Sequence, residues 1–125
     1  MGEVLLFNLE PQKAIAVKNL CRKLYLEYRE VAPEDHGRKL GFLLGITDDD
    51  TAEADACFEE EMLYFSDISS GMLDIILAQL RRRKCTVALK AVRTETNVQF
   101  TACELCRELS AERAAIARGQ QAHQP

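Results

Sequence analysis

The sequence has no long hydrophobic run and no segment typical of an exported protein. Its apolar stretches are all well short of the roughly 20 residues that a helix needs to cross a bilayer. The first residues, Met1–Phe7, include an acid at Glu3 and continue directly into strand-forming residues, which is not the pattern of a signal peptide. Leu6 stands where an N-myristoylation sequence would carry Ser or Thr. We therefore expect a cytoplasmic protein without a membrane partner.

Motifs of the common enzyme classes are also missing. We find no Ser-His-Asp set, no phosphate-binding Walker loop and no Gly-rich dinucleotide fingerprint. We therefore favour a non-enzymatic role, leave an enzymatic one open, and expect neither a cofactor nor catalytic residues.

The cysteines do not form the pattern of a disulfide framework or a zinc site. Their number, five, is odd in a chain without a secretory signal, which favours reduced thiols. Zinc needs four ligands, and only Cys103 and Cys106 have the spacing of a ligand pair. The remaining candidates form no second pair with that spacing: Cys21, Cys57, Cys85, His36 and His123. We therefore expect no metal site.

Charge is distributed unevenly along the chain. Eight of the 20 acidic residues fall between Thr47 and Glu61, where there is no basic residue. The rest of the chain then carries 16 basic and 12 acidic residues, a mild excess for a nucleic-acid-binding protein. We expect the acidic segment to be a solvated, extended linker. A calcium loop is disfavoured, because Asp48–Glu53 lacks glycine at its sixth position.

Apolar residues recur with helical spacing in three segments. Each has them at i, i+3, i+4 and i+7: Val17–Leu24, Leu73–Leu80 and Ala102–Leu109. Pro11 suits the first position of the first helix, and Ser69 can cap the second. Thr96 and Gln99 have capping-box spacing before the third. The sequence therefore predicts three substantial helices with defined starts.

Strand-like segments alternate with these helices. The expected strands cover Glu3–Leu9, Tyr28–Ala32, Met62–Asp67 and Thr86–Val92. The expected helical segments cover Pro11–Leu26, Arg38–Leu44, Ser70–Arg83 and Asn97–Ala117. This order predicts an α/β fold: a two-layer sandwich of a four-stranded sheet with the helices on one side, with the ferredoxin-like arrangement as one candidate.

The two halves of the chain resemble each other. Leu5 matches Leu63 at an offset of 58 residues, and Leu20 matches Leu80 at an offset of 60. The pattern indicates an internal β-α-β-α repeat, with duplication and chance both open as its origin. One such unit cannot bury both faces of a two-stranded sheet, whereas two units that share a four-stranded sheet can.

The length of 125 residues is that of a single domain. We expect a first half at 1–46, the acidic joint at 47–61 and a second half at 62–118. Residues 119–125, rich in Ala, Gln and His, are expected to fray.

The run Cys103-Glu104-Leu105-Cys106 has the spacing of a thiol redox motif. A helix that starts near Asn97 places Cys103 a turn or more inside, where the helix dipole lowers a thiol pKa little. Glu104 and Glu108 add negative charge, which opposes the thiolate. We therefore favour a packing role for Cys103 and Cys106 and keep a redox module as the third functional hypothesis.

The corner after the last strand is the better ligand-site candidate. It would combine free N–H groups of a helix start with polar and basic side chains from Lys90, Arg93, Thr94, Thr96 and Asn97. Such a set suits an anion or a small polar ligand. In the competing interpretation Thr96 only caps the helix and Asn97 only supports the turn.

Two other polar features have structural explanations. The basic run Arg81–Lys84 ends a helix, where cations complement the negative end of the helix dipole. Because Tyr64 and Phe65 belong to the core pattern and not to a stacking surface, we expect no nucleic-acid partner. His36 is expected to be an exposed histidine without a specific role.

The run Leu89–Asn97, LKAVRTETN, resembles a signature of a family of small bacterial domains of unknown function. In that family a strand, a Thr-x-Thr-Asn corner and an acidic helix occur together, and the resemblance covers about Glu61–Glu112. It implies a compact cytosolic domain and no catalytic residues. The family carries an aromatic residue where this chain has Phe100 and aliphatic residues near Cys103 and Cys106, which implies that these cysteines replace apolar side chains.

These observations favour a non-enzymatic protein-interaction or regulatory binding module. The alternative is a small-anion or metabolite-binding domain that uses the Thr94–Asn97 corner. The expected partner is accordingly a protein or a small anion.

Overall fold

The computed structural model describes residues 2–53 and 58–122, with side chains as far as Arg118. Along the chain it contains β1 (Glu3–Phe7), α1 (Pro11–Lys23), β2 (Glu27–Glu30), α2 (Leu40–Leu43), β3 (Met62–Ser66), α3 (Ser70–Arg82), β4 (Leu89–Val92) and α4 (Ala102–Ala122). Single 3-10 turns lie at Pro33–Asp35 and Asn97–Gln99. The part of the expected frayed tail at 123–125 lies outside the described residues, and α4 includes 119–122.

The four strands form one open sheet in the order β2-β1-β3-β4. The two outer pairs, β1 with β2 and β3 with β4, are parallel, and each is joined by a helix. The central pair, β1 with β3, is antiparallel. The predicted α/β class and four-stranded sheet are therefore confirmed.

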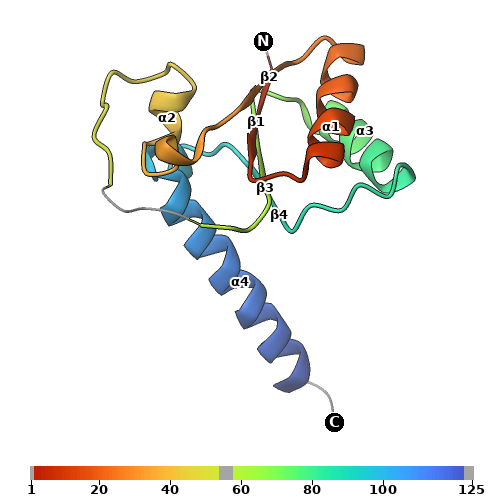
Figure 1. Ribbon diagram of the computed structural model, residues 1–125. Coiled ribbons are helices and arrows are strands. Elements are labelled where there is room, and N and C mark those ends of the chain that lie inside the picture. The colour runs from red at the N-terminus through yellow and green to blue at the C-terminus, as the bar shows by residue number, and fades with distance from the viewer. Residues whose placement is uncertain (1, 54–57, 123–125) are drawn as a thin grey trace.

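The helices cover both faces of the sheet, so the prediction that they lie on one side is wrong. On β1, Val4 and Leu6 join a core cluster with residues of α1 and α3. The alternate residues Leu5 and Phe7 join a second cluster with residues of α2 and the start of α4. Successive side chains of a strand point to opposite faces, so an unbroken apolar run such as Val4–Phe7 is typical of a strand that is covered twice. Figure 1 shows α1 and α3 together on one side of the sheet.

The ferredoxin-like arrangement is not confirmed. In that fold each β-α-β unit is split, with another strand between its two strands. Here β1 lies directly beside β2 and β3 directly beside β4. The structure instead has two compact parallel units that meet through antiparallel central strands.

The two halves have the same element order, and equivalent positions are 59 residues apart as far as the end of the first helix and 62 residues apart at the second strand. Asn8 and Asp67, directly after the first strand of each half, both have left-handed backbones, with φ of 59° and 56°. Tyr25 and Lys84, after the helix of each half, have φ of 58° and 55°. The predicted offset of 58 near β1 is wrong by one residue, and in a strand one residue reverses the face. Duplication as the origin of the likeness stays a prediction.

Most described residues of the acidic segment are exposed to solvent, as expected, but several of its acidic side chains are fixed by contacts with the rest of the chain. The Glu61 carboxylate accepts hydrogen bonds from Glu10 N–H at 2.9 Å and Lys13 Nζ at 2.7 Å. Burial acts to raise the pKa of Glu61, but these two hydrogen bonds outweigh it and leave the pKa below its usual value. Asp49 forms an ion pair with Lys39. These acids therefore attach the segment to the first half, while residues 54–57 lie outside the described part.

Helix α4 begins later than the sequence suggests. Thr101, not Thr96, caps it: Thr101 Oγ1 accepts a hydrogen bond from Glu104 N–H at 3.0 Å. In return the Glu104 carboxylate accepts one from Thr101 N–H at 3.1 Å, which completes a capping box. Thr96 precedes a 3-10 turn and its side chain forms no cap bond. In the capping box at Thr101 the second hydrogen bond is accepted by the carboxylate of Glu104. A carboxylate is a stronger acceptor than the amide of Gln99, which would be its counterpart in a box at Thr96.

Thr101→Ala is expected to lower the free energy of unfolding by about 1 kcal/mol, the usual loss when an N-cap oxygen is removed. Thr96→Ala is the matched control and should change it by less than about 0.5 kcal/mol, as at most surface sites. Urea unfolding of both variants measures the difference. A larger loss for Thr96→Ala would place the cap at the predicted position.

Candidate functional site

The structure does not bring the five predicted corner residues together. Lys90 is paired with Leu63 of β3, and Leu63 belongs to the core cluster under α1 and α3. Directly paired residues share a face of the sheet, so Lys90 lies on the α3 side. Asn97 is instead bonded to Tyr64, whose side chain belongs to the cluster on the opposite face. Lys90 is therefore separate from the Thr94–Asn97 corner.

The corner is held together by the side chain of Asn97. Its Oδ1 accepts hydrogen bonds from the Tyr64 hydroxyl at 2.6 Å and Thr94 N–H at 2.8 Å. Its Nδ2 donates to the carbonyl of Val92 at 2.9 Å. Its backbone N–H donates to Thr94 Oγ1 at 2.9 Å. A ligand at this corner would have to displace hydrogen bonds that the fold already uses.

Arg93 and Thr96, two other residues of the predicted corner, have different surroundings. Arg93 Nη1 donates to the hydroxyl of Ser66, a buried residue at the end of β3, at 3.1 Å. Thr96 is exposed. Burial raises the pKa of the Tyr64 phenol, so its hydroxyl remains a donor to Asn97. The corner is thus a structural connection between β3, β4 and the start of α4.

The later start of α4 places Cys103 in its first turn, so the prediction that Cys103 lies a turn or more inside is wrong. The surroundings still oppose a reactive thiol. Cys103 and Cys106 are both buried, and Cys106 Sγ lies 2.9 Å from a carboxylate oxygen of Glu60. Burial, followed by this contact with a negative charge, raises the pKa of the Cys106 thiol to about 12. A redox cysteine needs the reverse, a lowered pKa with access to solvent.

His36 is a core residue, so the expectation that it is exposed is wrong. Its ring is stacked on Phe58 with centroids 4.7 Å apart and meets the edge of Phe7 at 5.3 Å. Its Nε2 lies 3.2 Å from the carbonyl of Val31. Burial lowers the pKa of His36, which favours a neutral ring in a packing role.

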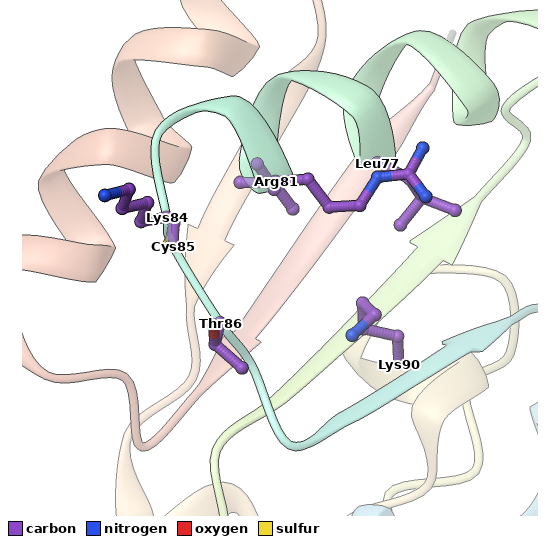
Figure 2. A pocket seen from close by; sticks show the side chains of 7 residues that line it. Leu77, Arg81, Lys84, Cys85, Thr86 and Lys90 are labelled. Atoms are coloured by element: carbon purple, nitrogen blue, oxygen red, sulfur yellow. The ribbon is translucent and has the colours of Figure 1, made fainter.

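Sequence reasoning missed a pocket between the end of α3 and β4. It has a volume of about 410 Å³, within the range of small-molecule sites, and is lined by Leu77, Leu80, Arg81, Lys84, Cys85, Thr86 and Lys90. Figure 2 shows Arg81 extending along α3 above Lys90, which rises from β4. Lys84 points away from both. The basic run contained part of the signal, but only the fold shows that Arg81 and Lys84 line the same pocket as Lys90.

The electrostatics of the pocket favour negative charge. None of its lining residues is acidic, and in the described part of the chain Arg81 forms no ion pair. Lys90 Nζ donates one hydrogen bond, to the carbonyl of Val87 at 2.9 Å, and an ammonium has two more to give. Burial raises the pKa of Cys85, and Lys90 is among the cations that oppose the rise. Positive charge is therefore concentrated here without a fixed counter-charge.

Residues 2–53 and 58–122 contain no helix with both the length and the apolar character needed to cross a bilayer. They also contain no group of three or more His, Cys, Asp or Glu side chains placed to hold a metal ion.

Comparison with known protein families finds that residues 61–116 are similar to a Domain of unknown function (DUF3783). The matched region runs from the residue before β3 to within α4. Comparisons with curated proteins and with solved structures gave no match. The region that the sequence resemblance singled out is thus the region matched, and it includes the pocket.

Asn97→Ala is expected to lower the free energy of unfolding by about 2–3 kcal/mol, because it leaves the buried Tyr64 hydroxyl without its partner. Urea unfolding measures the loss. In a Tyr64→Phe background, where there is no hydroxyl to strand, the same change should cost at least about 1 kcal/mol less. An equal loss of free energy of unfolding in the two backgrounds would contradict a hydrogen bond between Asn97 and the Tyr64 hydroxyl.

Cys106 is expected to react slowly with iodoacetamide. The rise of its pKa from 9.0 to about 12 leaves about a thousandfold less thiolate at a given pH below 9. Its rate of alkylation should still be rising with pH above pH 10, and peptide mass spectrometry can follow it. Rapid alkylation at pH 7, or a Cys103–Cys106 disulfide in the native protein, would reverse the conclusion and favour the redox hypothesis.

Proposed function

We propose that this chain is a non-enzymatic binding module for an anionic ligand, held in the pocket between α3 and β4. The observation that carries the proposal is that Arg81 and Lys90, from two different elements, line one pocket that no acidic residue lines. An arginine guanidinium and a lysine ammonium are the usual partners of phosphate and carboxylate groups.

The fold accounts for the two cations only in part. Arg81 is placed at the end of α3, where a cation complements the helix dipole. Lys90 lies in β4, away from that dipole, and donates one hydrogen bond to the carbonyl of Val87, so its ammonium has two further N–H groups to offer an anion.

The other functional hypotheses have less support. The Thr94–Asn97 corner has its main polar groups bonded to one another. A protein partner stays a prediction, because the large exposed apolar side chains come from six separate segments: Ile15, Tyr25, Ile46, Ile75, Val92 and Ile116. Neither offers a ligand the unmatched charge that the pocket does.

Phosphate is expected to raise the melting temperature of the wild-type protein when chloride of equal ionic strength is the reference. At ten times its Kd, a ligand stabilises by about 1.4 kcal/mol, which corresponds to about 4–8 °C in a domain of this size. Arg81→Gln and Lys90→Gln should each reduce the rise to less than about half. Differential scanning fluorimetry measures these shifts.

Arg82→Gln is the matched control. Arg82 belongs to the same basic run but does not line the pocket, so this variant should keep the full rise. General exclusion of phosphate from the protein surface would stabilise all the variants alike. If the four proteins respond equally, the pocket is not an anion site.

A further inference from the structure

We infer that the ligand is an organic phosphate monoester with an apolar body, and not a bare inorganic anion. This inference rests on the proposed function, since it assigns the phosphate group to Arg81 and Lys90. It adds the part of the ligand that those cations do not contact.

The size of the pocket gives the first argument. A phosphate group between Arg81 and Lys90 would occupy a small part of the 410 Å³. Pockets of roughly 300–1,000 Å³ are those that enclose small organic molecules. The remaining space extends past Leu80 to Cys85 and Thr86, which line the same pocket.

The lining of that space gives the second argument. Leu77 and Leu80 supply an apolar wall on α3, and Leu77 lies four residues before Arg81 on the same helix. Apolar surface next to a cation is unfavourable for a fully hydrated small anion, which would leave that surface in contact with water. It is favourable for an anion whose own apolar group covers it.

The opposite end of the pocket gives the third argument. The backbone leaves α3 through Lys84, and the next two residues present a thiol and a hydroxyl, Cys85 and Thr86. These groups can donate a hydrogen bond to a polar atom at the far end of a ligand. The pocket thus combines the cations Arg81 and Lys90, an apolar wall along α3, and the polar groups of Cys85 and Thr86 next to Lys84, which suits a phosphate ester with an apolar body.

The test compares three probes by isothermal titration calorimetry: methyl phosphate, phenyl phosphate and benzyl alcohol. Phenyl phosphate should bind about tenfold more tightly than methyl phosphate, the gain from covering roughly two methylene groups' worth of apolar surface. Benzyl alcohol should bind at least tenfold more weakly than phenyl phosphate. Arg81→Gln should weaken both phosphates by a similar factor.

Leu77→Gln is the deciding variant, since Leu77 lines the pocket, is only partly buried and is not a member of either core cluster. It should remove the preference for phenyl phosphate and leave the affinity for methyl phosphate unchanged. Ile75→Gln, an exposed change on the same helix outside the pocket, should leave both affinities unchanged. Saturating phenyl phosphate should also slow alkylation of Cys85 by N-ethylmaleimide at least threefold.

The outcomes separate the two proposals. Equal affinities for methyl and phenyl phosphate, both reduced by Arg81→Gln, would overturn the organic-phosphate inference and leave the anion site in place. Binding of neither phosphate would overturn both. Binding of phenyl phosphate that is insensitive to Arg81→Gln, or that does not protect Cys85, would place the ligand elsewhere and also overturn both.

Discussion

The antiparallel pairing of β1 with β3 is the constraint on which the rest of the structure depends. All five residues of β3 are buried, as are four of the five in β1. A pair of strands buried on both faces must be covered twice, which requires two layers of helices around a sheet of only four strands. The parallel partners β2 and β4 then occupy the edges, and each helix is placed by the strand that precedes it.

This arrangement also separates the two polar regions of the second half. Leu63 and Tyr64 are neighbours on β3, but their side chains belong to opposite core clusters. Asn97 is bonded to Tyr64 on one face of the sheet, and Lys90 is paired with Leu63 and lies on the opposite face. The alternation of side chains along β3 therefore places these two polar groups on opposite faces of the sheet.

Much of the fold could be predicted from local patterns, and the errors have identifiable physical causes. Ser69 caps α3 as its position suggested, since its hydroxyl accepts a hydrogen bond from Met72 N–H. The start of α4 was misplaced because Thr96 and Thr101 are each followed three residues later by a side chain that can complete a capping box. Only the fold shows which of the two pairs forms it. The number of layers was underestimated although the unbroken apolar run Val4–Phe7 is the pattern of a strand that is covered on both faces.

The pocket could not be predicted from the sequence, for a different reason. Arg81 and Lys90 are nine residues apart with a helix end and a loop between them, so no periodic pattern connects them. Their placement in one pocket depends on how β4 is aligned against β3, which is set by tertiary packing and not by local sequence. Residue types alone indicated a basic helix end, which is correct but incomplete.

The antiparallel centre of the sheet has a consequence for any shorter chain built from the second half alone. Without β1, one edge of β3 would present unpaired N–H and C=O groups next to exposed apolar side chains. Because β1 and β3 run in opposite directions and carry equivalent helices, a second copy of the same half could take the place of β1. Two such copies, related by a twofold axis, would rebuild a four-stranded sheet, so a homodimer of half-length chains and the single chain described here are alternative ways to complete one architecture.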